Sequence, residues 1–170
     1  TIIIFAGDNG LAVGQHGLMG KQNVYEHSVG VPLMIKAAAQ HTGKKTADLC
    51  YLIDVFPTLC DMLQLPVPQS VDGISLLSSL DGKEPVRDYL YYSYMDNQRG
   101  ISDGTWKLIE YHVNGKRTTQ LFNLKNDPWE RNDLSGQKKY EKTIQRLREK
   151  MAEEQKRTND TSVFWNNFSY

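Results

Sequence analysis

The sequence has few cysteines and no long apolar run. Its thiols are Cys50 and Cys60, which are too few for a disulfide framework and lack the spacing of a zinc site. We expect both in one helix, too far apart along its axis to bridge each other, and interpret them as small core residues. No apolar stretch approaches the roughly 20 residues of a membrane-spanning helix.

Net charge is also absent, because Lys plus Arg and Asp plus Glu both number 20. This balance gives no reason to expect a nucleic acid or an anionic membrane as a partner. The chain lacks an initiator Met and a signal peptide and opens on an apolar run, residues 2–5. Such a β-branched run is typical of a buried strand in a parallel sheet. We therefore expect a fragment of a longer protein, with an open strand edge that favours self-association.

The first half of the chain, residues 1–84, predicts an α/β fold. Strands are expected over residues 2–6 and 31–36, both rich in apolar side chains. Between Asp48 and Leu63 the apolar residues recur at helical spacing, and Pro57 predicts a kink or a break there. We interpret this part as the end of a mostly parallel α/β sandwich.

The second half, residues 85–170, predicts an antiparallel meander followed by a helix. Asp103-Gly104 and Asn114-Gly115 lie between alternating apolar runs, which is a strong hairpin signal and indicates about four strands. The stripe of Tyr140, Ile144, Leu147 and Met151 predicts a C-terminal helix with one apolar face. Its alternating charges indicate a solvated opposite face.

A polar turn follows the first expected strand. Asp8 and Asn9 are flanked by Gly7 and Gly10, which permit a sharp bend. A carboxylate and an amide oxygen are hard ligands that suit Ca²⁺ or Mg²⁺. The alternative is an ordinary turn in which both side chains bond to their own backbone.

A Gly-rich segment, residues 11–30, carries the second pair of candidates. Lys21 can bind anionic oxygens as a point charge, and His16 can protonate a leaving oxygen. The alternatives are a solvated lysine and a hydrogen-bonded surface histidine.

Taken together, these segments resemble the type I sulfatases of the alkaline phosphatase superfamily. The resemblance follows the order of the chain up to about residue 150, and its ordered set of motifs is more specific than any single one. The motifs are Thr1-Ile-Ile-Ile-Phe-Ala-Gly-Asp8-Asn9-Gly10, Gly14-Gln-His16-Gly17-Leu-Met-Gly20-Lys21, Tyr25-Glu26, Val31-Pro32-Leu33, Asp54-Val-Phe-Pro57-Thr58-Leu59, Val71-Asp72-Gly73-Ile-Ser75-Leu76-Leu77, Arg99, Trp106-Lys107-Leu108, Leu121-Phe122-Asn123-Leu124, Asp127-Pro128-Trp-Glu130 and Asn132-Asp-Leu134.

The resemblance implies a site and a chemistry. Asp8 and Asn9 would be calcium ligands, Lys21 would contact the sulfate oxygens, and His16 would line the substrate pocket. In this family a formylglycine hydrate attacks sulfur, and its precursor lies in a Cys-or-Ser, x, Pro-or-Ala, x, Arg motif. Neither Cys50 nor Cys60 fits that motif, and the family's paired acidic ligands near the N-terminus are missing. We therefore expect these residues alone to be inactive and to bind calcium weakly.

Two rivals remain open at this point. One is a phosphodiesterase or phosphonate monoester hydrolase of the same superfamily, because fold-level analogy does not fix the substrate. The other is a non-catalytic module that binds a glycan or a protein through the aromatic residues of the meander. These are Tyr89, Tyr91, Tyr92, Tyr94 and Trp106. Their ordinary interpretation is core and cross-strand packing. The resemblance also implies a parent protein that is periplasmic, secreted or lysosomal and acts on a sulfated small molecule or glycan.

Overall fold

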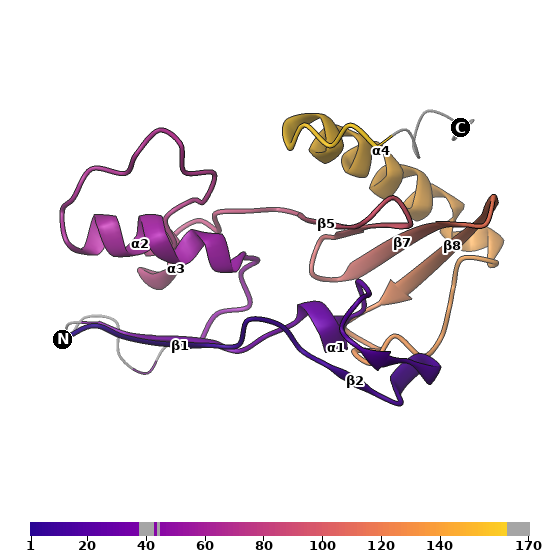
Figure 1. Ribbon diagram of the computed structural model, residues 1–170, viewed down its shortest axis with the longest axis horizontal. Helices are drawn as coiled ribbons and strands as arrows, with labels where there is room; N and C mark the ends of the chain where they lie inside the picture. Colours follow the sequence, from indigo (N-terminus) through magenta and orange to yellow (C-terminus); the bar gives the residue numbers. More distant parts are fainter. Residues whose placement is uncertain (38–42, 44, 163–170) are drawn as a thin grey trace. The chain divides into compact units, whose positions relative to one another are not determined.

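The computed structural model describes residues 1–37, 43 and 45–162 (Figure 1). The elements in chain order are β1 (Ile3–Ala6), β2 (Ala12–Val13), the 3₁₀ helix η1 (Gln15–Gly17), β3 (Met19–Gly20), α1 (Glu26–Val29), β4 (Leu33–Lys36), η3 (Leu52–Asp54), α2 (Val55–Met62), α3 (Leu77–Leu80), β5 (Leu90–Tyr94), β6 (Gln98–Ser102), β7 (Trp106–Val113), β8 (Lys116–Asn123), η4 (Lys138–Tyr140) and α4 (Glu141–Arg157). None of the helices in this described part is both long and apolar enough to cross a membrane.

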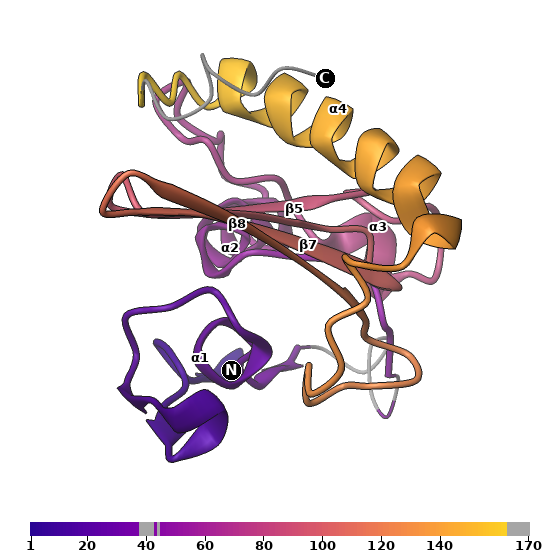
Figure 2. The same ribbon diagram turned by 90° about the vertical axis from the view of Figure 1, so that its right-hand side faces the viewer.

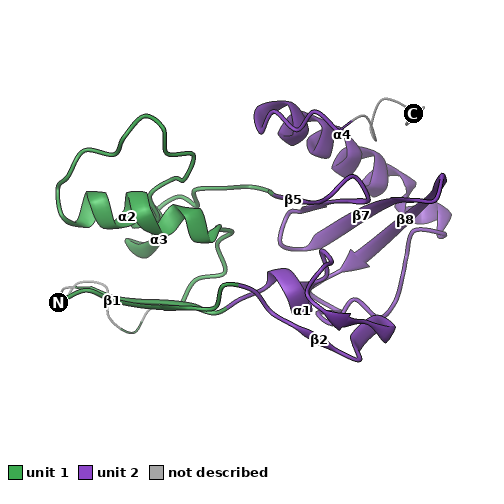
Figure 3. Cartoon of the chain, in the orientation of Figure 1, with its two compact units in different colours: residues 1–8, 32–90 green, residues 9–31, 91–170 purple. Residues whose placement is uncertain are grey.

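The chain forms two compact units (Figure 3). Unit 1 comprises residues 1–8 and 32–90, and unit 2 comprises residues 9–31 and 91–170. The segment 9–31 thus packs with the meander that follows it in sequence by some sixty residues or more. As a division into domains, the boundary between residues 84 and 85 stays a prediction.

The first expected strand exists, but its surroundings differ from the prediction. β1 pairs antiparallel with β4, and Phe5 lies opposite Met34. Ile3 and Phe5 are 53% and 58% exposed. The prediction of a buried strand in a parallel sheet is therefore wrong for the described residues. An apolar run indicates a strand, whereas burial and direction depend on the segments that lie beside it.

The helix predicted from Asp48 to Leu63 is shorter than expected. The 3₁₀ helix η3 leads into α2, so Pro57 lies in the first helical turn. A backbone N–H at this position would have no intrahelical partner, so the proline costs no hydrogen bond. The helix therefore begins near Pro57, and neither the kink nor the break predicted at that residue occurs. Cys50 precedes both helices, which makes the prediction of a shared helix wrong. Both cysteines are free thiols, but only Cys60 is buried, as expected of a core residue, whereas Cys50 is partly exposed.

Asp54 organises the interior of unit 1. Its buried carboxylate accepts hydrogen bonds from the backbone N–H groups of Tyr51 and Ile74, both at 2.8 Å. It also forms an ion pair with Arg87, whose Nε lies 3.1 Å away. Thr58 adds a second connection, because its hydroxyl accepts a hydrogen bond from the backbone N–H of Leu76 at 2.8 Å. These bonds fasten the segment after α2 onto the start of that helix.

Unit 2 is built on the predicted meander. Its strands follow the order β5-β6-β7-β8, with antiparallel pairing of β6 with β7 and of β7 with β8. α4 covers one face of the sheet, and α1 with its flanking segments lies on the other (Figure 2). Ile144, Leu147 and Met151 of α4 are buried, as the apolar stripe predicted.

The opposite face of the sheet holds the second core. Val24 and Tyr25 pack against Ile109 and Phe122. Tyr92 and Tyr94 are partly buried against this cluster, which supports the packing interpretation of the meander aromatics. This packing is what attaches the Gly-rich segment, with its candidate residues, to the sheet.

Candidate functional site

Asn9 and Lys21 meet in the structure. Asn9 Oδ1 accepts a hydrogen bond from Lys21 Nζ at 2.7 Å, and Asn9 Nδ2 donates to the Gly10 carbonyl at 2.9 Å. Gly10 is required here, because a Cβ would lie 2.0 Å from the carbonyl oxygen of His27. The amide oxygen of Asn9 therefore faces the ammonium group of Lys21.

A small hairpin positions Lys21. β2 pairs antiparallel with β3, and Lys21 follows Gly20, whose φ of 109° is favourable only for glycine. The side chain of Lys21 is exposed. An accessible ammonium next to an amide oxygen suits the binding of an anionic group.

The His16 side chain is exposed, but a stacked ring and a hydrogen bond hold it in place. Its ring stacks on Tyr25 with centroids 4.0 Å apart and planes 6° apart. Its Nε2 lies 3.2 Å from the carbonyl oxygen of Trp129. A carbonyl only accepts, so this bond requires a proton on Nε2. The ring of His27 lies beside this pair, with its centroid 5.6 Å from those of both His16 and Tyr25.

Asp8 is the last residue of the first segment of unit 1, whereas Asn9 begins unit 2. Calcium takes six to eight oxygen ligands, of which these two side chains could supply only a part. Among the described residues, no three His, Cys, Asp or Glu side chains form a group that could hold a metal ion. The donor types fit calcium but the set is incomplete, so the calcium site stays a prediction.

A buried ion cluster lies behind these residues, and the sequence interpretation missed it. Lys107 is fully buried, with its Nζ 2.8 Å from Glu26 Oε1 and 3.1 Å from Glu130 Oε1. The backbone N–H of Glu26 donates to Glu130 Oε2 at 2.6 Å. The ammonium also lies 5.0 Å from the ring centroid of Tyr92. The sequence does contain a signal for this cluster, which is a lysine within the apolar run of β7. A buried lysine requires carboxylate partners, so this lysine indicates an ion pair inside the fold.

Burial shifts the titration of two groups in this region. Desolvation raises the pKa of Glu130, although the charge of Lys107 opposes the shift. Desolvation lowers the pKa of His27, and the neighbouring His16 and Lys107 lower it further. His27 is thus kept neutral more readily than an exposed histidine.

The family model described as N-sulphoglucosamine sulphohydrolase, C-terminal, matches residues 14–157. The chain belongs to this family. It is thus a C-terminal sulfatase region of the alkaline phosphatase-like superfamily, as the resemblance implied. The matched range contains His16 and Lys21, whereas Asp8 and Asn9 precede it.

Several sulfatases are similar to this family member. An N-acetylglucosamine-6-O-sulfatase of Bacteroides thetaiotaomicron is 30% identical over 173 residues, which cover 94% of this chain and 31% of that protein. Arylsulfatase K of Homo sapiens is 27% identical, with 75% of this chain and 26% of that protein covered. The chain therefore spans about a third or less of the length of these curated relatives.

Solved structures agree with this assignment. BT4656, whose structure holds its substrate D-glucosamine-2-N,6-O-disulfate, matches with a TM-score of 0.78 and 28% identity, over 96% of this chain and 35% of that one. A phosphonate monoester hydrolase of Agrobacterium radiobacter matches with a TM-score of 0.75 and 24% identity, over 89% of this chain and 34% of that one. The second likeness concerns the fold alone.

Proposed function

We propose that this chain is part of a sulfuric ester hydrolase that cleaves sulfate esters of a carbohydrate or aryl substrate. Lys21 binds the sulfate oxygens, and His16 gives a proton to the oxygen that leaves sulfur. The observation that carries the proposal is the exposed ammonium of Lys21, 2.7 Å from Asn9 Oδ1. A bound sulfate oxygen would take the place of that amide oxygen as the acceptor of the Lys21 proton.

Calcium and a formylglycine nucleophile complete the proposal. Asp8 and Asn9 would hold part of the calcium shell, and the ion, when bound, would neutralise charge on the sulfate oxygens. The nucleophile would come from a segment upstream of these residues, because neither Cys50 nor Cys60 lies in the required motif. We therefore expect the 170 residues by themselves to hydrolyse no sulfate ester.

Support for a sugar substrate comes from a similar sequence and a similar solved structure. The sequence is that of an N-acetylglucosamine-6-O-sulfatase, and the structure of BT4656 holds a disulfated glucosamine. The rival glycan- or protein-binding function of the meander has less support. Tyr92 and Tyr94 pack against the core, and Tyr91 is buried and bonded to Asp160. We place the parent protein outside the cytoplasm, in the periplasm, the lysosome or the medium.

The test compares ester classes on the full-length protein that contains this chain. We expect turnover of p-nitrophenyl sulfate and glucosamine 6-sulfate, with loss of activity when a chelator removes calcium. Lys21→Met should lower kcat/KM by about a hundredfold, because one preorganised cation at the transferred group is lost.

The matched control is Lys125→Met, which removes an exposed lysine elsewhere in unit 2 and should leave kcat/KM unchanged. Faster hydrolysis of phosphonate monoesters or phosphodiesters than of sulfates would establish the superfamily rival. Turnover by the isolated 170 residues would refute the upstream nucleophile.

A further inference from the structure

We infer that Lys107, which lies in the sheet and not in the candidate site, is a positioning residue that orients the His16 imidazole. The role of His16 as a proton donor rests on the proposed function, whereas the positioning is a property of the folded chain. The two carboxylate partners of Lys107, Glu26 and Glu130, each directly follow a residue that contacts His16.

The closest ring contact and the hydrogen bond of His16 both come from immediate chain neighbours of those carboxylates. Its ring stacks at 4.0 Å on Tyr25, the residue before Glu26. Its Nε2 lies 3.2 Å from the carbonyl oxygen of Trp129, the residue before Glu130. One buried ammonium that holds both carboxylates therefore fixes the two residues that hold the imidazole.

Backbone strain at Glu130 supports this arrangement. Its φ of 54° lies in the left-handed region, which is unfavourable for a residue with a Cβ. Such a conformation persists where its surroundings fix it, and here the Lys107 ammonium and the N–H of Glu26 hold the Glu130 carboxylate. Since φ sets the angle between the side chain and the preceding peptide, fixing the carboxylate also aims the Trp129 carbonyl at His16.

The consequence for chemistry is the choice of tautomer. The bond to Trp129 keeps a proton on Nε2 of His16, so Nδ1 is the nitrogen that exchanges a proton with a bound ester. If the carbonyl moved away, the ring could rotate or change tautomer, and the proton-donating nitrogen would no longer be defined. A displacement of about 1 Å in a catalytic group can cost as much as a hundredfold in rate.

Lys107→Met in the full-length protein tests the inference. The side chains are similar in length, so the change mainly removes the charge. The main readout is the ¹⁵N chemical shift of the His16 ring, assigned by its loss in His16→Gln. We expect one Nε2–H tautomer in the unchanged protein and a mixture of tautomers in the variant. We also expect kcat to fall by about tenfold or more, with a smaller change in KM.

Glu110→Gln is the matched control. Glu110 lies on the same strand, is equally buried, and pairs with Arg148 at 2.7 Å on the α4 side of the sheet. It should destabilise the fold without changing the His16 tautomer or kcat. If Lys107→Met does not fold, Glu130→Gln gives the answer, because it weakens the same cluster and keeps an acceptor for the Glu26 N–H.

An unchanged His16 tautomer in the folded variant would overturn the inference, as would an equal change in Glu110→Gln. The tautomer is measured independently of turnover. A protein without sulfatase activity but with the expected tautomer change would therefore refute the proposed function and leave the positioning intact.

Discussion

Asp160 shows how one carboxylate can fix the chain beyond a helix. Arg99 donates to it through two nitrogens, at 2.7 and 3.1 Å, and the hydroxyl of Tyr91 donates at 2.6 Å. The Arg99 side chain is 3% exposed. Arg99 therefore has a structural role, because its charge joins the segment after α4 to β6.

The Asp160 cluster predicts a stability change in acid. Burial by itself raises the pKa of Asp160, but the hydrogen bonds from Arg99 and Tyr91 outweigh it, so the pKa lies below its ordinary value of 3.8. A lowered pKa means that the stabilisation is complete above 3.8 and is lost as the pH falls through the folded-state pKa. Asp160→Asn should therefore lower the free energy of unfolding by about 1–3 kcal/mol at neutral pH, with less loss in acid.

Urea unfolding at several pH values measures this difference. Asp96→Asn is the control, because Asp96 also faces Arg99, at 3.9 Å, but its side chain is 87% exposed. A surface ion pair of that kind contributes little. Equal losses in the two variants, or a loss at Asp160 that does not depend on pH, would contradict the explanation.

At the scale of elements, the contact between α2 and the segment 71–77 depends on one glycine. A Cβ at Gly73 would lie 2.3 Å from the carbonyl oxygen of Ile53 and 3.1 Å from Pro57 Cγ. This close approach lets the N–H of Ile74 reach Asp54 at 2.8 Å. The two sequence motifs around Asp54 and Gly73 are therefore two sides of one contact.

Gly73→Ala should destabilise unit 1 by about 1–3 kcal/mol, because the backbone must move and the bond to Asp54 lengthens. Gly136→Ala is the matched control, since a Cβ there meets nothing within 4 Å. It should be neutral or slightly stabilising. Thermal unfolding of both variants decides the point, and equal melting temperatures would show that the segment tolerates a side chain.

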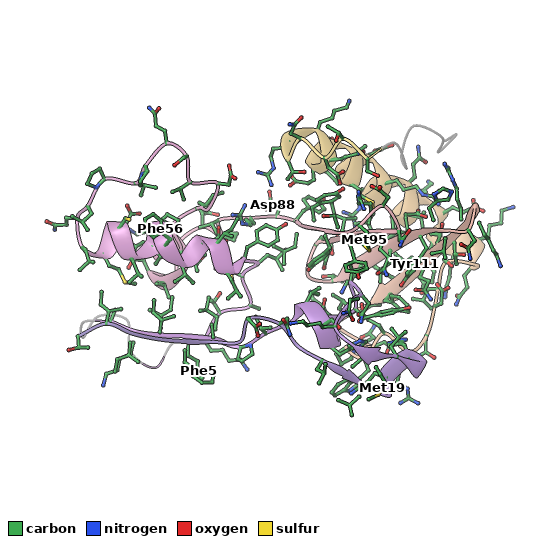
Figure 4. All side chains as sticks on the ribbon, in the orientation of Figure 1. Phe5, Met19, Phe56, Asp88, Met95 and Tyr111 are labelled. Carbon is green, nitrogen blue, oxygen red and sulfur yellow. The ribbon has the colours of Figure 1, made fainter. Side chains whose placement is uncertain are left out.

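At the scale of the whole chain, the two units differ in how they cover their apolar surface. The sheet of unit 2 is covered on both faces. In unit 1, Phe5 of β1 (labelled in Figure 4) lies opposite Met34 of β4. Both side chains are 58% exposed. An exposed two-stranded sheet with apolar side chains is a template for further pairing. We therefore expect the 170 residues to self-associate through the exposed β1–β4 sheet.

We predict that the isolated chain forms dimers or larger species and that Phe5→Glu shifts it toward monomer. Light scattering after gel filtration measures the mass of each species. Met95 is another exposed apolar residue (labelled in Figure 4), and its side chain is 69% exposed. Met95→Glu adds the same charge there and should leave the mass unchanged. A monomeric unchanged chain would refute the prediction.

The sequence by itself determined the elements whose signals are local. Asn114-Gly115 predicted the β7–β8 turn, because both positions take positive φ, 52° and 73°. The stripe of Ile144, Leu147 and Met151 predicted the buried face of α4, because helical spacing places these residues on one side. Asn9 and Lys21 were identified as candidates from residue type and neighbouring glycines, and the structure brings them together.

Only the tertiary structure decided the features that depend on distant segments. The antiparallel partner of β1 and the Lys107 cluster each depend on contacts between residues far apart in the chain. Local pattern reports which face of an element is apolar, but not which segment will cover it. A buried charge is the extreme case: Lys107 is stable inside the sheet only because folding brings Glu26 and Glu130 to it.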